Sequence, residues 1–545
     1  MSGLLAIAAI AVAAASGLPG LLLRRRPVLA QRASAAALCG AAVLGVAAAV
    51  PVLAGAPPFL AHLPWRQPYA SLALRLDSLS ALFLLPILVV PALGAVYGLA
   101  YWPQERLGPR AVALQLWYGL VAGSMGLVVL ADNAMLFLIG WEVMAVCGFF
   151  LVRADGDRRD ALRASWIYLA AAHVGTFAIF AFFAVAGSAR GSFDFGAWTG
   201  RLSGLPGAGW LALLALVGFG LKAGLVPLHF WLPGAHAAAP SHVSAVMSGV
   251  LLKTGVYGLF RSAGFFEAPP ASWGVVVLVL GGASAVLGVA LGALGALDAP
   301  LVDRVSFAVL VVPVLGLVGA LAAACFVKVQ GTVFLGNPRT PEAAAAHESP
   351  RAMLVPMGIL AASCAAIGAL PALLVPPLTR GAAAWSGLPL SAFAEEAEAA
   401  SRSAVRVSGV ALVLLAVVGA LVLWRRRRAA APDPVSETWG CGYSRPTFRM
   451  AYTGSSFAQI LNQGFRFVLF PRVRFSPPRG PFPASASFST EPREAVLDLA
   501  LLPAVRDYIQ ATSRIRGLVA GRLHLQALLV LATLVAMLAW RFLRE

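Results

Sequence analysis

The chain has 545 residues, of which 60% are hydrophobic and only 12% are charged. This balance leaves too little polar surface to cover soluble domains of that length, so the composition predicts an integral membrane protein. The formal net charge of +18 would suggest nucleic acid in a soluble protein, but the basic residues stand mainly between apolar runs, where they orient helices in a bilayer. We therefore expect the lipid bilayer, and no nucleic acid, as a partner.

Apolar runs long enough to cross a hydrocarbon core of roughly 30 Å recur along the whole chain. Such runs must be helices, because the short alternating segments of a transmembrane barrel are absent from the sequence. The fold class predicted is all-α, a polytopic membrane protein with about thirteen transmembrane helices. The predicted spans are 4–23, 34–53, 79–101, 111–130, 134–152, 161–185, 210–229, 243–260, 273–297, 307–327, 353–374, 407–424 and 525–540.

The first apolar run lacks a charged segment before it and is followed by Arg24, Arg25 and Arg26, which predicts an uncleaved span with its N-terminus outside. The early loops then obey the positive-inside rule. After the tenth span the charges invert, which indicates that an odd number of crossings is missing between Leu297 and Phe307. The alternative is that one run does not cross, or that the later loops tolerate their charges.

The C-terminal part has a different character. Residues 429–493 form a basic segment rich in Pro, Ser, Phe and Arg, which we expect outside the membrane. From Glu494 to Arg522 apolar residues recur at near-helical spacing among charges, which predicts an amphipathic helix on a membrane or a partner. An anchor helix at 525–540 follows.

Three charged residues stand inside predicted spans, where an uncompensated charge costs several kcal/mol. Glu142 lies in the middle of the fifth span, Lys222 at a similar depth in the seventh, and Lys253 a little past the middle of the eighth. A membrane Lys can instead reach the interface with its charged end. Opposite charges on separate spans more often mark an ion pathway or an ion pair, so we favour a functional role for all three.

Four histidines also stand near or within spans. His229, His236 and His242 lie between the two lysines, on a segment interrupted by prolines. His229 and His242 are either proton relays or polar helix ends satisfied by backbone groups, and the sequence leaves both interpretations open. His173 stands alone in the sixth span and is interpreted as a packed, hydrogen-bonded core residue.

Metal and disulfide chemistry is not indicated. The five cysteines are scattered, with no C-x-x-C pair and no metal-ligand spacing. We expect no metal site and no catalytic residue on this chain.

Five stretches of the sequence resemble a known family, the antiporter-like subunits of respiratory complex I and its relatives. The similarity is carried by the stretches 77–80, 140–142, 222–236, 239–241 and 252–255, of which 222–236 is the most specific. The tail stretches Thr438–Tyr443 and Tyr452–Phe457 are similar to the branch of hydrogenase-4 component B and formate hydrogenlyase subunit 3.

The resemblance implies two inverted five-helix bundles, each with a half-channel. Glu142 and Lys222 would form the first bundle's ion pair, Lys222 would take up and pass on a proton, and Lys253 with His229 and water would carry it sideways. His236 and His242 are further candidate relays. No redox cofactor is implied, because electrons would flow through partner subunits.

The family pattern also predicts the domain organisation. N-terminal helices occupy 1–110, a complete first bundle 111–262, a truncated second bundle with following helices 263–428, the basic segment with its amphipathic helix 429–524, and the anchor 525–545. About three helices of the second bundle are missing after 273–297, in agreement with the charge inversion.

Three functions follow from this interpretation. The first is a proton-translocating, non-redox membrane subunit of a complex I-like hydrogenase or formate hydrogenlyase. Its expected partners are other membrane subunits and nickel–iron hydrogenase subunits, with formate dehydrogenase subunits as a further candidate, in the inner (plasma) membrane. The alternatives are a subunit of a multi-subunit sodium/proton antiporter and a non-pumping structural subunit.

Overall fold

The computed structural model describes residues 1–63, 71–156, 158–267, 319–320, 322–334, 338, 340–428, 459, 463, 472–477, 480, 487–491 and 495–519. The chain divides into two compact units, Met1–Ala451 and Tyr452–Glu545.

Nine helical segments of this part are long and apolar enough to cross a membrane. They are α1 with α2 (Ser2–Leu22), α3 (Pro27–Leu53), α4 (Ser78–Tyr101), α6 (Pro109–Leu130), α7 (Ala134–Val152), α8 (Arg159–Arg190), α11 with η2 and α12 (Ser241–Ala263), α16 (Arg351–Ala369), and η5 with α18 (Leu390–Arg428). Shorter helices are α5 (Gln104–Leu107), α9 (Ala208–Ala223), α10 (Leu232–Ala238), α15 (Pro341–Ala344), α17 (Val375–Ser386) and η4 (Pro371–Leu374).

The multi-pass helical architecture predicted from hydrophobicity is confirmed, and the span 134–152 is matched at both ends. Asn133 explains the start of α7, because its side chain accepts hydrogen bonds from the amides of Met135 and Leu136. The predicted seventh span is too long: α9 ends at Ala223 instead of running on to His229. The predicted spans 273–297 and 525–540, most of 307–327, and the junction between Leu297 and Phe307 lie outside the described residues.

Two short hairpins accompany the helices, which refines the all-α prediction. Strand β1 (Phe59–Leu63) pairs antiparallel with β2 (Leu72–Leu76) just before α4. In the second unit, β3 (Arg472–Ser476) pairs antiparallel with β4 (Ser487–Glu491), inside the segment predicted as basic and extramembrane. Short hairpins escape a search based on long apolar runs, because alternating strands of five residues carry little hydrophobic signal.

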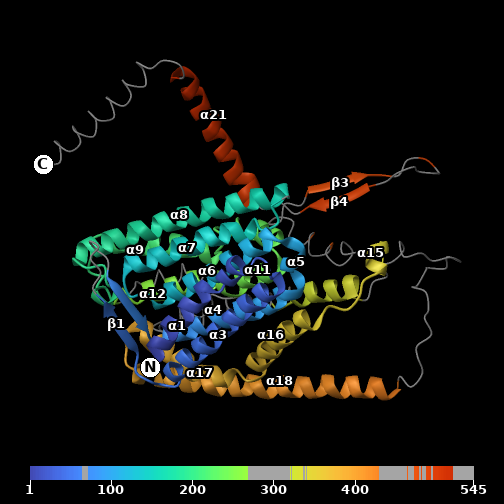
Figure 1. Cartoon of the computed structure of the whole chain (residues 1–545). Coiled ribbons are helices and arrows are strands. Elements are labelled where there is room, and N and C mark those ends of the chain that lie inside the picture. The colour runs from blue at the N-terminus through green and yellow to red at the C-terminus, as the bar shows by residue number, and fades with distance from the viewer. Residues whose placement is uncertain are drawn as a thin grey trace. The chain divides into compact units, whose positions relative to one another are not determined.

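The core of the first unit is a bundle of α1, α3, α4, α6, α7, α8, α9 and α12 (Figure 1). Its centre is aromatic, with Trp141 and Phe137 of α7 stacked at 5.5 Å and both rings in edge contact with Phe219 of α9. These side chains are almost fully buried. The aromatic packing therefore links α7 to α9, which positions the candidate site.

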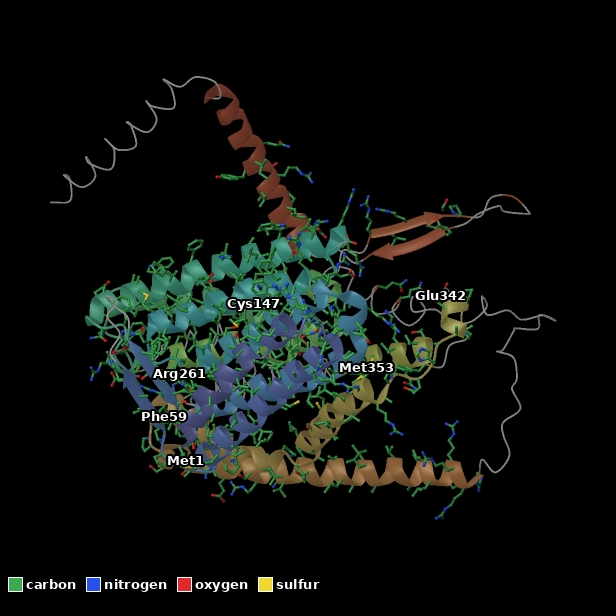
Figure 2. The ribbon with its side chains drawn as sticks, viewed as in Figure 1. Met1, Phe59, Cys147, Arg261, Glu342 and Met353 are labelled. Atoms are coloured by element: carbon green, nitrogen blue, oxygen red, sulfur yellow. The ribbon has the colours of Figure 1, made fainter. Side chains whose placement is uncertain are left out.

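Two later helices pack differently. Helix α16 contacts α4 and α18, but no residue of α18 is buried. Figure 2 shows the side chains of α18 projecting freely along most of its length. Such an apolar helix needs lipid or another subunit around it.

In the second unit, a π-helical turn η7 (Ala495–Leu501) leads into α21 (Leu502–Val519), so the helix predicted for Glu494–Arg522 is confirmed over 495–519.

Candidate functional site

The site is built around the end of α9. Gly224 ends the helix with φ +74°, a left-handed conformation that favours glycine. Leu225 donates its amide to the carbonyl of Gly220, and the indole of Trp231 donates to the carbonyl of Leu221 at 2.8 Å. The interrupted helix is therefore closed by specific partners before α10 begins at Leu232.

Lys222 occupies the last turn of α9 and is only 4% exposed. Its Nζ donates to the hydroxyl of Tyr168 on α8 at 3.0 Å and lies 5.8 Å from the ring centre of Trp141 and 5.1 Å from that of Tyr168. A cavity of about 10 Å³ adjoins these side chains, which is close to the size needed for one water molecule. The amine thus has a hydroxyl, two aromatic faces and room for water.

Glu142 does not contact Lys222, although the family resemblance implied a direct ion pair. Its Oε2 lies 3.4 Å from Nε2 of His173 on α8, and the two side chains are 36% and 40% exposed. The geometry explains the difference: Glu142 is rotated by about 100° around α7 from Trp141, whose ring faces Lys222.

His173 is hydrogen-bonded, as expected, but it is not alone. Its Nδ1 lies 2.9 Å from the carbonyl of Leu169, so Nε2 is left facing Glu142. Glu142 and His173 therefore form a second, partly exposed polar group on the same two helices, α7 and α8, that supply Trp141 and Tyr168 to the Lys222 site.

Close backbone packing holds α9 against its neighbours. A Cβ on Gly218 would lie 2.9 Å from the carbonyl of Gly175 on α8, and a Cβ on Gly255 of α12 would lie 2.5 Å from the amide of Ala223. Only glycine permits these approaches. Lys222 is thereby held at a fixed distance from α8 and α12.

Lys253 stands on α12, two residues after the π-helical turn η2 (Met247–Leu251). It is partly buried, and it forms no salt bridge with another residue of the described ranges. His229 lies partly buried in the segment between α9 and α10. π-helical turns often occur at functional sites, which is consistent with a role for this part of α12.

His236 and His242 lie in different surroundings. Nδ1 of His236 lies 2.7 Å from the hydroxyl of Ser244. This pair borders an opening of about 420 Å³, here called the vestibule, whose wall also includes Asp155 and Arg158. His242 is 4% exposed and is enclosed by tyrosine rings. The structure thus separates the histidines into one at an opening and one in the interior.

A polar cluster elsewhere in the bundle was not predicted from the sequence. The guanidinium of Arg261 on α12 donates to both carboxylate oxygens of Asp77 at 2.7 and 3.0 Å, and also to the hydroxyls of Ser80 and Tyr257. Burial by itself would raise the pKa of Asp77, but Arg261 holds that pKa below its usual value. Figure 2 places Arg261 near the end of the bundle that carries Phe59 and Met1.

The sequence contained only a weak signal for this cluster. Asp77 belongs to a family stretch and Arg261 stands near a span end, 184 residues away. Nothing in the sequence pairs them. Tyr168 carries no sequence signal for its place in the Lys222 site, because aromatic residues in spans are ordinary, and Trp231 is marked only by its place in the stretch 222–236.

The chain is similar to known membrane proteins. Residues 131–299 match the family described as NADH:quinone oxidoreductase/Mrp antiporter, transmembrane. Hydrogenase-4 component B of Escherichia coli is 29% identical over 611 residues, covering 86% of this chain and 89% of the relative. Formate hydrogenlyase subunit 3 of the same species is 31% identical over 160 residues, covering 29% of this chain and 25% of the relative.

Two solved structures share the fold. The Mrp complex from Dietzia sp. DQ12-45-1b contains a chain that aligns with a TM-score of 0.52 at 19% identity, over 100% of this chain. The present chain spans only 63% of that Mrp chain. An archaeal membrane-bound sulfane sulfur reductase contains one that aligns with a TM-score of 0.57 at 18% identity, over 98% of this chain and 99% of its own length.

The fold and the charges within its spans define a multi-pass membrane protein of antiporter-like architecture. Residues 131–299 carry the antiporter-like domain of the complex I superfamily, and the chain is similar to hydrogenase-4 component B over 86% of its length and to formate hydrogenlyase subunit 3 over 29%. The alignment with hydrogenase-4 component B is longer than the 545 residues of this chain, so the relative contains residues with no counterpart here.

Proposed function

We propose that this protein is a proton-translocating membrane subunit of a hydrogenase- or formate hydrogenlyase-type complex. The observation that carries the proposal is Lys222, an amine buried in the bundle at the end of an interrupted helix and bonded to a hydroxyl instead of a carboxylate. A buried Lys without a direct counter-charge binds its proton less firmly, so it can take up and release one.

The proton would travel through groups that lie at intervals across the bundle. The vestibule with His236 would provide contact with water. Lys222 and Tyr168 would hold the proton in the interior, and Glu142 with His173 would receive it at the more exposed surface of α7 and α8. Lys253, His229 and His242 are assigned as relays on the strength of their positions in α11, α12 and the interrupted segment.

The Glu142–His173 pair supports the presence of a neighbouring membrane subunit. Both side chains are more than a third exposed in the middle of spans, where contact with lipid is costly for ionisable groups. The relatives named above are components or subunits of larger assemblies. We propose nickel–iron hydrogenase or formate dehydrogenase subunits as the soluble partners, and the plasma membrane as the location.

The decisive experiment measures proton uptake by the assembled complex in sealed vesicles. Lys222→Ala should abolish proton movement while leaving assembly and electron transfer intact. Arg402→Ala, which removes an exposed charge on α18, is the control and should behave as wild type. Proton movement unchanged by Lys222→Ala would refute the proposal.

A second candidate, a subunit of a sodium/proton antiporter, is favoured by the likeness to the Mrp fold. It predicts sodium-dependent exchange in the same vesicles. The structural alternative predicts that Glu142→Gln is silent, whereas proton translocation requires that this change slow the transfer.

A further inference from the structure

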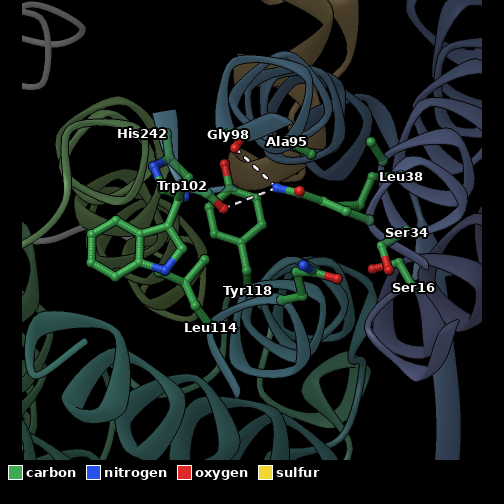
Figure 3. Close-up of a pocket in the computed structure, with 12 residues that line it drawn as sticks. Ser16, Ser34, Leu38, Ala95, Gly98, Trp102, Leu114, Tyr118 and His242 are labelled. Carbon is green, nitrogen blue, oxygen red and sulfur yellow. Dashed lines mark hydrogen bonds between the residues drawn. The ribbon is translucent and has the colours of Figure 1, made fainter. Parts of the chain in front are cut away.

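A second cavity lies away from Lys222, among α1, α3, α4, α6 and α11. Its volume is about 30 Å³, and twelve residues of α1, α3, α4, α6 and α11 and their flanks line it (Figure 3). A water molecule needs roughly 10–15 Å³ of such space, so about two waters fit. The relation to Lys222 is indirect, because the two cavities share no lining residue among those described.

Four buried polar atoms on this cavity's wall have no hydrogen-bond partner among the described residues. They are Nε1 of Trp102, Oε1 of Gln115, the hydroxyl of Tyr118 and Nδ1 of His242. Tyr118 and His242 are only 2% and 4% exposed. Buried polar atoms are nearly always hydrogen-bonded, so these four require a ligand that the described residues do not supply.

The chemistry of the wall identifies that ligand as water. The four atoms include a donor, an acceptor, a hydroxyl that can do either, and an imidazole nitrogen. The described residues that line the cavity include no carboxylate, Lys or Arg that would attract an ion. A cluster of neutral donors and acceptors around a space for about two waters is typical of an internal hydration site.

The backbone makes room for this arrangement. A Cβ on Gly94 of α4 would lie only 2.1 Å from the Tyr118 hydroxyl. Glycine at this position therefore lets the Tyr118 hydroxyl reach across from α6 toward α4. The ring of Tyr118 lies 5.5 Å from that of His242, which brings both polar side chains to the same cavity.

The cavity adjoins the vestibule. Trp102 lines both spaces, and Tyr101, which lines the vestibule, has its ring 5.8 Å from that of His242. The hydroxyl of Ser241, next to His242 in the chain, donates to Tyr101 at 3.2 Å. Aromatic side chains and one hydroxyl pair thus lie where the internal cavity meets the vestibule.

We propose that this cavity is a hydrated side chamber of the vestibule, in which about two bound waters join Tyr118 to His242 and load protons onto His242. A chamber water gives a proton to Nδ1 of His242 and is reprotonated from the vestibule, and the imidazolium then releases one proton from Nε2, so the imidazole gains and loses one proton per cycle. The titratable groups that face His242 are Tyr97 and Tyr101 of α4 and Tyr118 of α6. The loading step rests on the proposed function.

The test combines a high-resolution cryo-electron microscopy map of the assembled complex with proton uptake in vesicles. We expect water density within hydrogen-bond distance of Tyr118 and His242. His242→Gln, which keeps hydrogen-bonding capacity but cannot be protonated, should retain the density and slow proton uptake at least fivefold. Tyr118→Phe should lose one water and slow uptake. Ser363→Ala, on α16 far along the chain and bonded to its own helix, is the control.

A dry cavity in a well-resolved map would overturn the proposal, and so would wild-type uptake by His242→Gln with the waters in place. The variant Lys222→Ala distinguishes failure of the side-chamber proposal from failure of the proposed function. If Lys222→Ala abolishes uptake while His242→Gln and Tyr118→Phe do not change it, only the side chamber is refuted. If Lys222→Ala also leaves uptake unchanged, the proposed function itself fails.

Discussion

Replacing Arg261 by Met tests whether the buried cluster around Asp77 stabilises the fold. The change removes two hydrogen bonds to Asp77 and the bonds to Ser80 and Tyr257, while the Met chain fills part of the same volume. Asp77 would remain as a buried carboxylate with the amide of Ser80 as its remaining partner in the cluster.

The expected cost follows from burial. Both side chains of the pair are 8% exposed, and removing one partner of a buried ion pair costs about 3–5 kcal/mol. One kcal/mol shifts the Tm of a large unit by roughly 1–2 °C, so we expect a lowering of roughly 3–10 °C. The assay is thermal unfolding of the detergent-solubilised protein, followed by intrinsic tryptophan fluorescence.

The matched control is Arg402→Met. Arg402 also forms an ion pair, with Glu398 at 2.6 Å, but the two side chains are 63% and 70% exposed. Exposed pairs contribute about 0–1 kcal/mol, so the Tm should hardly change. Equal shifts for Arg261→Met and Arg402→Met would refute the reasoning from burial.

A double variant separates charge from packing. Asp77→Asn keeps an N-cap acceptor for α4 and removes the negative charge, so adding it to Arg261→Met should recover part of the lost Tm.

The contribution of the Asp77–Arg261 pair to stability depends on pH with a definite sign. Because Arg261 holds the pKa of Asp77 below its usual value, the pair stabilises the protein fully above about pH 4 and loses its effect as the pH falls through the lowered pKa.

Three further predictions concern the candidate site and the topology. Trp231→Phe should cost about 1–3 kcal/mol, because it leaves the carbonyl of Leu221 without its indole donor, and it should also slow proton uptake; an unchanged Tm would contradict this. Gly255→Ala should cost about 1–3 kcal/mol by forcing α12 away from α9, whereas Gly358→Ala on α16, with no described neighbour within 4 Å, should be tolerated in the same unfolding assay. A cysteine placed near Arg428 should react with a membrane-impermeant thiol reagent only from the inside; labelling from outside would contradict an odd number of missing crossings.

The sequence by itself determined the class of protein and most of its helical segments. Hydrophobic runs must become helices in lipid, so their lengths predicted all nine described segments that are long enough to cross a membrane, without any tertiary information. The same runs predicted a position within the membrane for Lys222, and the stretch that begins at Lys222 carries the resemblance to the superfamily.

Only the tertiary structure decided which groups meet. Successive residues of a helix point about 100° apart, so Trp141 and Glu142 face different neighbours, and Glu142 meets His173 instead of Lys222. Arg261 finds Asp77 across 184 residues of chain because α12 and α4 pack together. Contacts such as these depend on how each helix is rotated and on how distant segments pack together. A pattern along one sequence shows neither the rotation nor the packing.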